Sequence, residues 1–159
     1  NAGQLARVSG FVERTPKHAR VVAGGNKIGN DGYFFEPTVV ADLKQTDDMI
    51  QQEMFGPVIT VQKFSDEAEA IKIANETQYG LSSYVWTENL ARAHRVAAAI
   101  EAGMCFVNSQ NVRDLRQPIG GTKASGTGRE GGTWSYEVFL EPKNVAVSLG
   151  SHHIPHWGV

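Results

Sequence analysis

Residues 81–108, LSSYVWTENLARAHRVAAAIEAGMCFVN, place two apolar segments on either side of a stretch with helical periodicity. Aromatic and β-branched side chains in residues 81–86 are typical of a strand. The stretch that follows carries apolar side chains three or four positions apart, which predicts a helix capped by Thr87 or Asn89. The side chains on its apolar face are Leu90, Ala93, Val96, Ala97 and Ile100. Residues 104–107 are apolar throughout, as expected for a central strand.

The residues before this stretch repeat the same order of elements. Residues 58–61 predict a strand, and Ser65 can cap a helix that has Asp66 and Glu67 in its first turn. The face of this helix expected to be apolar carries Ala68, Ile71, Ala74 and Asn75. Strand–helix–strand–helix–strand with short connections indicates a parallel sheet of the α/β class.

The N-terminal quarter predicts smaller elements. Residues 3–14 carry apolar side chains at helical spacing, and residues 20–23 predict a short strand. Residues 24–32 have the composition of a loop. Residues 33–40 are aromatic and β-branched but are broken by Pro37, which favours an extended segment at the edge of a sheet.

Beyond the last strand of the parallel unit lies a glycine-rich stretch, residues 118–132, followed by a predicted short helix at 134–140. Glycine-rich loops can direct backbone N–H groups at a phosphate. The spacing of a dinucleotide fingerprint or a P-loop is absent, so a structural turn is the favoured interpretation. Apolar side chains alternate in residues 144–149, which predicts a last strand.

Composition places the chain among ordinary water-soluble proteins. It has 159 residues, 41% hydrophobic and 20% charged, enough for one domain with a core. The net charge of −2 does not favour nucleic acid or an anionic membrane as a partner. One cysteine and no signal-peptide pattern fit a cytoplasmic location. Because the chain begins with Asn1 rather than methionine, we expect it to be a piece of something larger.

Two groups of potential metal ligands or nucleophiles have a plainer interpretation. Cys105 lies within an expected central strand, so a buried structural thiol is favoured over a reactive one. His152, His153 and His156 cluster near the C-terminus. No carboxylate or thiol accompanies them, so a solvated tail is favoured and no metal is expected.

Two further clusters carry side chains suited to binding. Arg113 and Arg116 flank an acidic residue just past a buried strand, where ligands gather in α/β folds. They could hold a carboxylate, or form a local surface pair with Asp114, and spacing alone does not decide between these roles. In the stretch QQEMFGPV, Glu53 could accept hydrogen bonds from paired hydroxyls while Phe55 packs on a planar group.

Five stretches in order resemble the C-terminal third of the NAD(P)-dependent aldehyde dehydrogenases. They read GYFFEPTV (32–39), EMFGPV (53–58), NETQYGLSS (75–83), GMCFVN (103–108) and PIGGTKASGTGREG (118–131). Within that family, residues 108–118 and the ending at 154–159 resemble the subfamily of 5-carboxymethyl-2-hydroxymuconate semialdehyde dehydrogenases. The resemblance implies that residues 1–141 belong to the catalytic domain. It also implies that residues 142–159 form an oligomerisation strand and tail.

The resemblance also implies roles for individual residues. Glu53 matches the glutamate that binds the nicotinamide ribose and Phe55 the aromatic beside the nicotinamide, with NAD or NADP as cofactor. Asn108 ends a strand on the substrate side. Arg113 is the first candidate for binding a substrate carboxylate and Arg116 the second.

The resemblance further indicates what lies outside this chain. The family's nucleophilic cysteine precedes these residues, and Cys105 does not match it, so we expect the chain alone to be inactive. Ile119 stands where the family usually has phenylalanine, which changes one wall of the pocket. Residues 144–149 match a strand that joins a neighbouring subunit. The alternative function is a self-associating module without catalysis.

Overall fold

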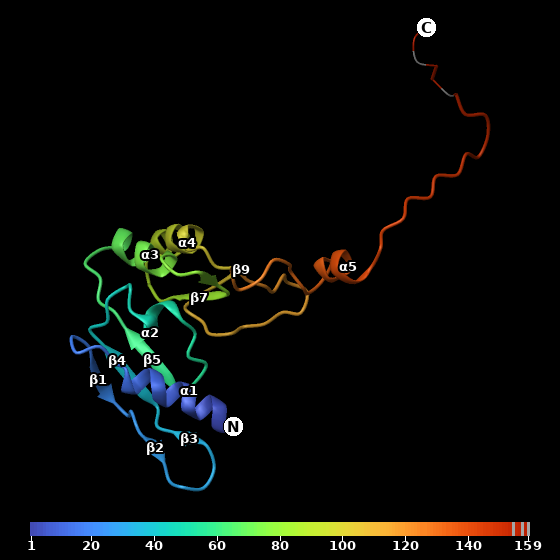
Figure 1. Cartoon of the computed structure of the whole chain (residues 1–159). Helices are drawn as coiled ribbons and strands as arrows, with labels where there is room; N and C mark the ends of the chain where they lie inside the picture. The colour runs from blue at the N-terminus through green and yellow to red at the C-terminus, as the bar shows by residue number, and fades with distance from the viewer. Residues whose placement is uncertain (154, 157, 159) are drawn as a thin grey trace.

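The computed structural model describes residues 1–153, 155, 156 and 158. Its first part pairs helix α1 (Ala2–Glu13) with a three-stranded sheet, and short helix α2 (Asp48–Gln51) follows that sheet's second strand (Figure 1). The sheet has the order β1-β4-β5, with bounds Arg20–Ala23, Thr38–Ala41 and Val58–Val61. Strand β1 is antiparallel to β4, whereas β4 and β5 are parallel. Strands β2 (Lys27–Ile28) and β3 (Phe34–Phe35), of two residues each, form an antiparallel hairpin.

The second part contains helices α3 (Glu67–Asn75) and α4 (Leu90–Ala99) and two small sheets. The parallel pair consists of β7 (Ser82–Val85) and β8 (Met104–Val107), with Ser82 opposite Met104. The antiparallel pair consists of β6 (Tyr79–Gly80) and β9 (Thr122–Lys123). Helix α5 (Trp134–Phe139) follows, and residues 141–153 then run away from the rest of the chain and are exposed throughout (Figure 1).

The apolar core lies in the first part, between α1 and the three-stranded sheet. Every buried residue of its cluster comes from residues 8–58, and Val40 of β4 is fully buried. The cluster consists of Val8, Phe11, Val12, Val40, Leu43, Met49, Met54 and Val58. In the second part only Val85 and Ala93 are buried among the described hydrophobic residues. The first part therefore supplies most of the hydrophobic stabilisation.

The structure confirms the α/β class and most of the predicted helices and strands, including α1, β1, β5, α4, β8 and α5. The strands expected in one parallel sheet are instead divided between two, because β5 does not pair with β7. Strand β8 pairs with β7 alone and is half-buried rather than central. On α4 only Ala93 is buried, and Leu90 is 73% exposed because a two-stranded sheet leaves its end of the helix uncovered.

Three local predictions are wrong. Residues 38–41 form the central strand of a sheet, not an edge; Pro37 precedes the strand, so its missing N–H removes no ladder hydrogen bond. Residues 24–32 include strand β2. Asp66, not Ser65, caps α3, because its carboxylate accepts from the Glu69 N–H at 2.8 Å.

The predicted last strand at residues 144–149 has no strand conformation in the structure. Its alternating side chains Val145, Val147 and Leu149 are 69%, 72% and 98% exposed. A strand needs a partner for its N–H and C=O groups, and this segment has none among the described residues. No helix in the described part of the chain is both long enough and apolar enough to cross a membrane.

Candidate functional site

The segment that carries Glu53 and Phe55 is a tight turn on the edge of the core. Met54 is buried in the core cluster, while its two neighbours are exposed. Phe55 has a φ of 56°, in the left-handed region, which costs a residue with a side chain about 1–2 kcal/mol. The Thr38 N–H then donates to the Pro57 carbonyl at 2.8 Å, which sets the entry into β5. The turn therefore presents two side chains outward from a fixed backbone.

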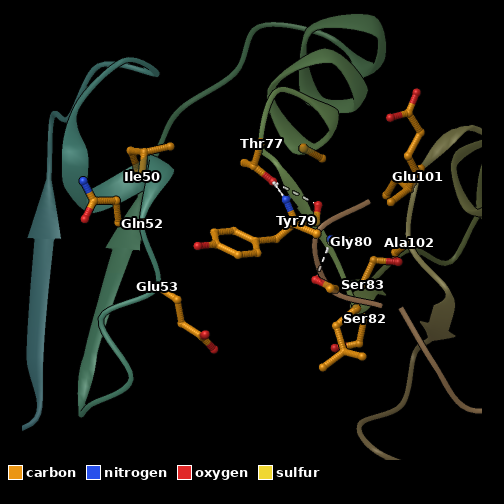
Figure 2. A pocket seen from close by; sticks show the side chains of 15 residues that line it. Ile50, Gln52, Glu53, Thr77, Tyr79, Gly80, Ser82, Ser83, Glu101 and Ala102 are labelled. Carbon is orange, nitrogen blue, oxygen red and sulfur yellow. Dashed lines mark hydrogen bonds between the residues drawn. The ribbon is translucent and has the colours of Figure 1, made fainter. Parts of the chain in front are cut away.

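Glu53 lines a cavity of about 690 Å³ that lies between the two parts of the molecule (Figure 2). Glu53, Gln52 and Ile50 come from the first part, and the opposite wall comes from residues 74–83, 100–102 and 124–125. Figure 2 shows the Glu53 carboxylate and the Tyr79 ring extending toward the middle of the cavity from opposite sides. No hydrogen bond or ion pair occupies that carboxylate within the described part of the chain. It is therefore free to accept hydrogen bonds from a ligand.

The opposite wall is fixed by the side chain of Lys123. Its ammonium donates to the carbonyls of Asn75 and Thr77 at 2.7 and 3.2 Å and pairs with Glu101 at 2.6 Å. The Asn75 side chain in turn donates to the Ala99 carbonyl and accepts from the Glu101 N–H, both at 2.9 Å. These contacts join the end of α3, the α4–β8 connection and β9.

The glycine-rich stretch packs against the protein's own backbone, as the structural-turn interpretation predicts. The Gly80 N–H donates to Ser125 Oγ at 3.0 Å, and Thr122 Oγ1 donates to the Gly80 carbonyl at 3.2 Å. Arg129 donates to the carbonyls of Gly121 and Gly128 at 2.6 and 2.9 Å. Ser125 and Thr122 thus bind Gly80 of β6, and Arg129 binds carbonyls within the stretch itself.

Sequence reasoning missed Tyr79 and the rest of this wall. The stretch NETQYGLSS contributes to the family resemblance, but no role was predicted for any of its residues. The signal that could have indicated Tyr79 was the position of this stretch, which leads from the end of α3 into β7. Residue type alone did not distinguish Tyr79 from an ordinary core tyrosine.

Phe55 does not share the cavity of Glu53. Its ring is 76% exposed and lines a separate cavity of about 290 Å³, with Tyr33, Phe34 and the start of α1. The two side chains leave the turn on either side of buried Met54. The structure thus places both predicted cofactor-binding residues on one turn, but it does not enclose them together.

Asn108, the predicted substrate-side residue, has its side-chain amide in use. Its Nδ2 donates to the Thr87 carbonyl and its Oδ1 accepts from the Thr87 N–H, both at 2.8 Å. Its φ of 48° is in the left-handed region, which asparagine tolerates better than most residues. These two hydrogen bonds join the segment that follows β7 to the segment that follows β8.

Arg113 lines a cavity of about 360 Å³ beside β8, together with Cys105, Phe106 and Ile119. Its guanidinium is exposed and donates to the Asn111 side chain at 3.0 Å. Cys105 is half-buried here rather than buried as predicted, because β8 has one neighbouring strand and this cavity opens beside it. Arg113, like Glu53, is therefore a predicted site residue that borders a cavity.

Arg116 instead forms the local pair that spacing allowed. Its guanidinium donates to both oxygens of Asp114, at 2.6 Å for the shortest contact. The Arg116 side chain lowers the pKa of the Asp114 carboxyl, and the Arg116 N–H adds to this. The pair is therefore ionised at neutral pH, and it is lost as the pH falls through the lowered pKa of Asp114.

Within the described ranges, no group of three His, Cys, Asp or Glu side chains is arranged to hold a metal ion. His152, His153 and His156 are exposed on the extended tail. Part of the ending used for the subfamily resemblance, residues 154, 157 and 159, lies outside the described residues.

Comparison with known proteins gives one consistent result. A family model described as "Aldehyde dehydrogenase family" matches residues 1–145. An aldehyde dehydrogenase of Emericella nidulans is 44% identical over 148 residues, which are 92% of this chain and 30% of that protein. The 4-trimethylaminobutyraldehyde dehydrogenase of Bos taurus is 39% identical over 157 residues, covering 94% and 32%. The chain therefore spans about a third of the length of the relatives it matches.

Solved structures agree in fold. The crystal structure of HpcC from Thermus thermophilus superposes with a TM-score of 0.89 at 41% identity, covering 99% of this chain and 32% of that one. An aldehyde dehydrogenase of Bacillus cereus, solved as its NAD⁺ complex, superposes with a TM-score of 0.89 at 37% identity, covering 94% and 31%. At these identities the likeness extends to sequence as well as fold.

Proposed function

The chain belongs to the aldehyde dehydrogenase family, and we propose that it forms the later wall of the active site of an enzyme that oxidises an aldehyde to its acid with NAD(P). Residues 1–141 are proposed as part of the catalytic domain, with residues 142–159 as an oligomerisation strand and tail. The observation that carries the proposal is Glu53, the first residue of the family motif EMFGPV, whose carboxylate has no partner among the described residues and lines the cavity of about 690 Å³. The single cysteine suits the reducing cytoplasm, the compartment we propose.

Glu53 and Phe55 are the proposed cofactor-binding residues. A carboxylate accepts two hydrogen bonds from the neighbouring hydroxyls of a ribose, and an exposed aromatic face packs on a flat ring. The free carboxylate of Glu53 and the 76% exposed ring of Phe55 suit these contacts. The relative from Bacillus cereus was solved with NAD⁺, so NAD is the cofactor we propose, with NADP as the alternative. The nicotinamide, when bound, accepts the hydride from the substrate.

In the proposed reaction a cysteine thiolate attacks the aldehyde carbon, and the resulting oxyanion is stabilised by nearby donors. Hydride leaves that carbon, and water then cleaves the thioester to release the acid and the thiol. Cys105 is not the proposed nucleophile, because it does not match the family's position and lies half-buried beside β8. The role of this chain is to hold the acceptor ring in line with the donor carbon. Residues 1–159 alone are proposed to form no NADH.

The proposed substrate is a carboxylated semialdehyde of the muconate type, as in 5-carboxymethyl-2-hydroxymuconate semialdehyde dehydrogenase. Arg113 borders the cavity beside β8 and has no carboxylate partner among the described residues. A guanidinium can bind a carboxylate through two parallel hydrogen bonds. Arg116 is the second candidate, since Asp114 already occupies it, and Asn108 supports the wall through Thr87.

Two substitutions in the full-length protein that carries these residues separate cofactor binding from substrate binding. Glu53→Gln keeps the shape but weakens the acceptor, and we expect slower single-turnover NADH formation with every aldehyde, by about tenfold for a loss of about 1.4 kcal/mol. Arg113→Gln should raise KM only for the carboxylated semialdehyde, by a similar factor of about ten. Stopped-flow absorbance of NADH measures both effects, with residues 1–159 alone as the blank.

Each assignment has its own contradicting result. Unaltered single-turnover NADH formation in Glu53→Gln would remove the cofactor role. An equal change in KM for a neutral aldehyde in Arg113→Gln would remove the carboxylate role. NADH formation by residues 1–159 alone that depends on Cys105 would show that this chain holds its own nucleophile.

A second proposal concerns self-association through residues 144–149. Their alternating apolar side chains are exposed, and their backbone has no strand partner in the described part of the chain. Such a segment can complete the sheet of another copy. We expect light scattering to show a dimer or larger species, and Val147→Lys to shift it toward the monomer. A monomer at high concentration before any substitution would reject both this homo-oligomer and the alternative function as a self-associating module.

A further inference from the structure

The turn that carries Glu53 and Phe55 is held by helix α1, through a side chain fifty residues away. Gln4 Nε2 lies 3.0 Å from the Met54 carbonyl oxygen and 2.6 Å from that of Phe55. A primary amide nitrogen has two hydrogens, so it can donate one to each carbonyl. Gln4 thus uses its full donor capacity on two successive residues of the proposed cofactor site.

This double contact depends on the left-handed conformation of Phe55. In an extended strand successive residues face opposite sides, so one nitrogen would not reach two neighbouring carbonyls. The φ of 56° at Phe55 turns the chain and brings the Met54 and Phe55 carbonyls to the same donor. Gln4 therefore favours the turned state over the extended state.

Arg7 lies one helical turn after Gln4 and contacts Glu53, the residue before Met54. Its Nη2 donates to the Glu53 carbonyl oxygen at 2.6 Å. The Arg7 guanidinium also lies 5.1 Å from the centre of the Phe11 ring, which is buried in the core. An aromatic face attracts a guanidinium, so Phe11 orients Arg7 toward the turn.

Packing fixes the other side of the same turn. Met54 is buried, and a Cβ at position 56 would overlap the side chain of Val8, so Gly56 lies directly against α1. The turn thus has polar contacts to Gln4 and Arg7 and apolar contacts to the core. Helix α1 makes both the polar contacts and the packing contact with Gly56, and so sets the direction of the turn's backbone.

We propose that Gln4 and Arg7 are positioning residues, which hold the left-handed turn at Phe55 and so aim the Glu53 carboxylate and the Phe55 ring at the cofactor. The inference rests on the proposed function for the identity of the ligand. The two residues act through backbone carbonyls, so their removal alters the direction of Glu53 without altering its chemistry.

The first test measures the turn itself in the 159-residue chain. Gln4→Glu keeps the size of the side chain and removes its donors, and Ala6→Glu adds the same charge at an exposed position of the same helix. A positive φ gives a strong intraresidue amide–Hα cross-peak in an NMR NOE spectrum. We expect the Phe55 cross-peak to weaken in Gln4→Glu and to persist in Ala6→Glu. An undiminished cross-peak in Gln4→Glu overturns the proposal.

The second test measures kinetics in the full-length protein that carries these residues. Arg7→Met loses one charge-assisted hydrogen bond and Gln4→Glu loses two neutral ones, and we expect each to raise KM for NAD by about tenfold while KM for the aldehyde is unchanged. Arg7→Lys should recover most of the loss, because an ammonium still donates to the Glu53 carbonyl. Equal rises in both KM values, or no recovery by lysine, overturn the aiming role.

The two tests separate this inference from the proposed function. A weakened Phe55 cross-peak together with normal NADH formation in Glu53→Gln rejects the cofactor role of the turn, and with it the aiming role. The contact between α1 and the turn is then still confirmed. If Glu53→Gln slows NADH formation but Gln4→Glu leaves the Phe55 cross-peak and KM for NAD unchanged, only the positioning role is rejected.

Discussion

Replacing Phe11 by alanine is expected to lower the free energy of unfolding by about 3–5 kcal/mol. Phe11 is 4% exposed and lies in the cluster that joins α1 to the three-stranded sheet. Its removal leaves a cavity and also takes away the ring over which Arg7 and Arg14 lie, at 5.1 and 5.4 Å. Single domains have a total stability of about 5–15 kcal/mol, so the loss is a large share. Urea unfolding followed by circular dichroism measures it.

Phe64→Ala is the matched control for Phe11→Ala. Phe64 is 62% exposed, so its truncation should change the free energy of unfolding by no more than about 0.5 kcal/mol. A third variant, Phe11→Leu, keeps an apolar side chain but removes the ring face, and its loss should be smaller than that of alanine. Equal decreases in the free energy of unfolding for Phe11→Ala and Phe64→Ala would show that the cluster is not the core of the first part.

Replacing Gly103 by alanine should give the second large effect, near the top of the range of about 1–3 kcal/mol for an overpacked site. A Cβ at this position would overlap the backbone carbonyl of Gly120. The backbone cannot easily withdraw, because the Gly103 N–H donates to the Gly80 carbonyl at 3.0 Å and the next N–H donates to Leu81 at 3.1 Å. The added methyl group therefore strains the start of β8.

Hydrogen exchange distinguishes this effect from a uniform loss of stability. Gly103→Ala should increase amide exchange in β7 and β8, next to the wall opposite Glu53, more than in α1. Gly150→Ala is the control, since a Cβ there meets nothing within 4 Å, and its expected change is within about 0.5 kcal/mol. Similar exchange in both variants would show that the Gly103–Gly120 approach is not tight.

The family, and most helices and strands, could be predicted from sequence because their signals are local. The start of α4 at Leu90 follows from Asn89, whose carboxamide oxygen accepts from the Arg92 N–H three residues later. The motif EMFGPV is equally local as a sequence signal, although the contacts that hold its turn come from α1. Where competing caps stood side by side, at Ser65 and Asp66, sequence alone did not choose correctly, since either side chain can accept the same kind of bond.

The sequence pointed to Glu53 in the candidate site, but not to Tyr79 on the opposite wall or to the contacts between side chains. Glu53 and Arg113 lie at cavities, as their types suggested. The amide of Asn108 is instead used by Thr87, 21 residues away. Sequence spacing does not reveal such partners, because a hydrogen bond depends on where two backbones meet.

By itself, the sequence determined the α/β class and the family, and it led to the proposals that Glu53 binds a ribose and Arg113 a carboxylate. Only the tertiary structure decided that β4 is the central strand, that β5 and β7 do not pair, and that Gln4 and Arg7 hold the turn at Phe55. The physical reason is the distance along the chain over which each interaction acts. Periodicity, capping and turn chemistry act over a few residues. The pairing of β4 with its neighbours joins residues about 20 apart, and the contacts of the turn with α1 join residues about 50 apart. These segments meet only when the core of the first part forms.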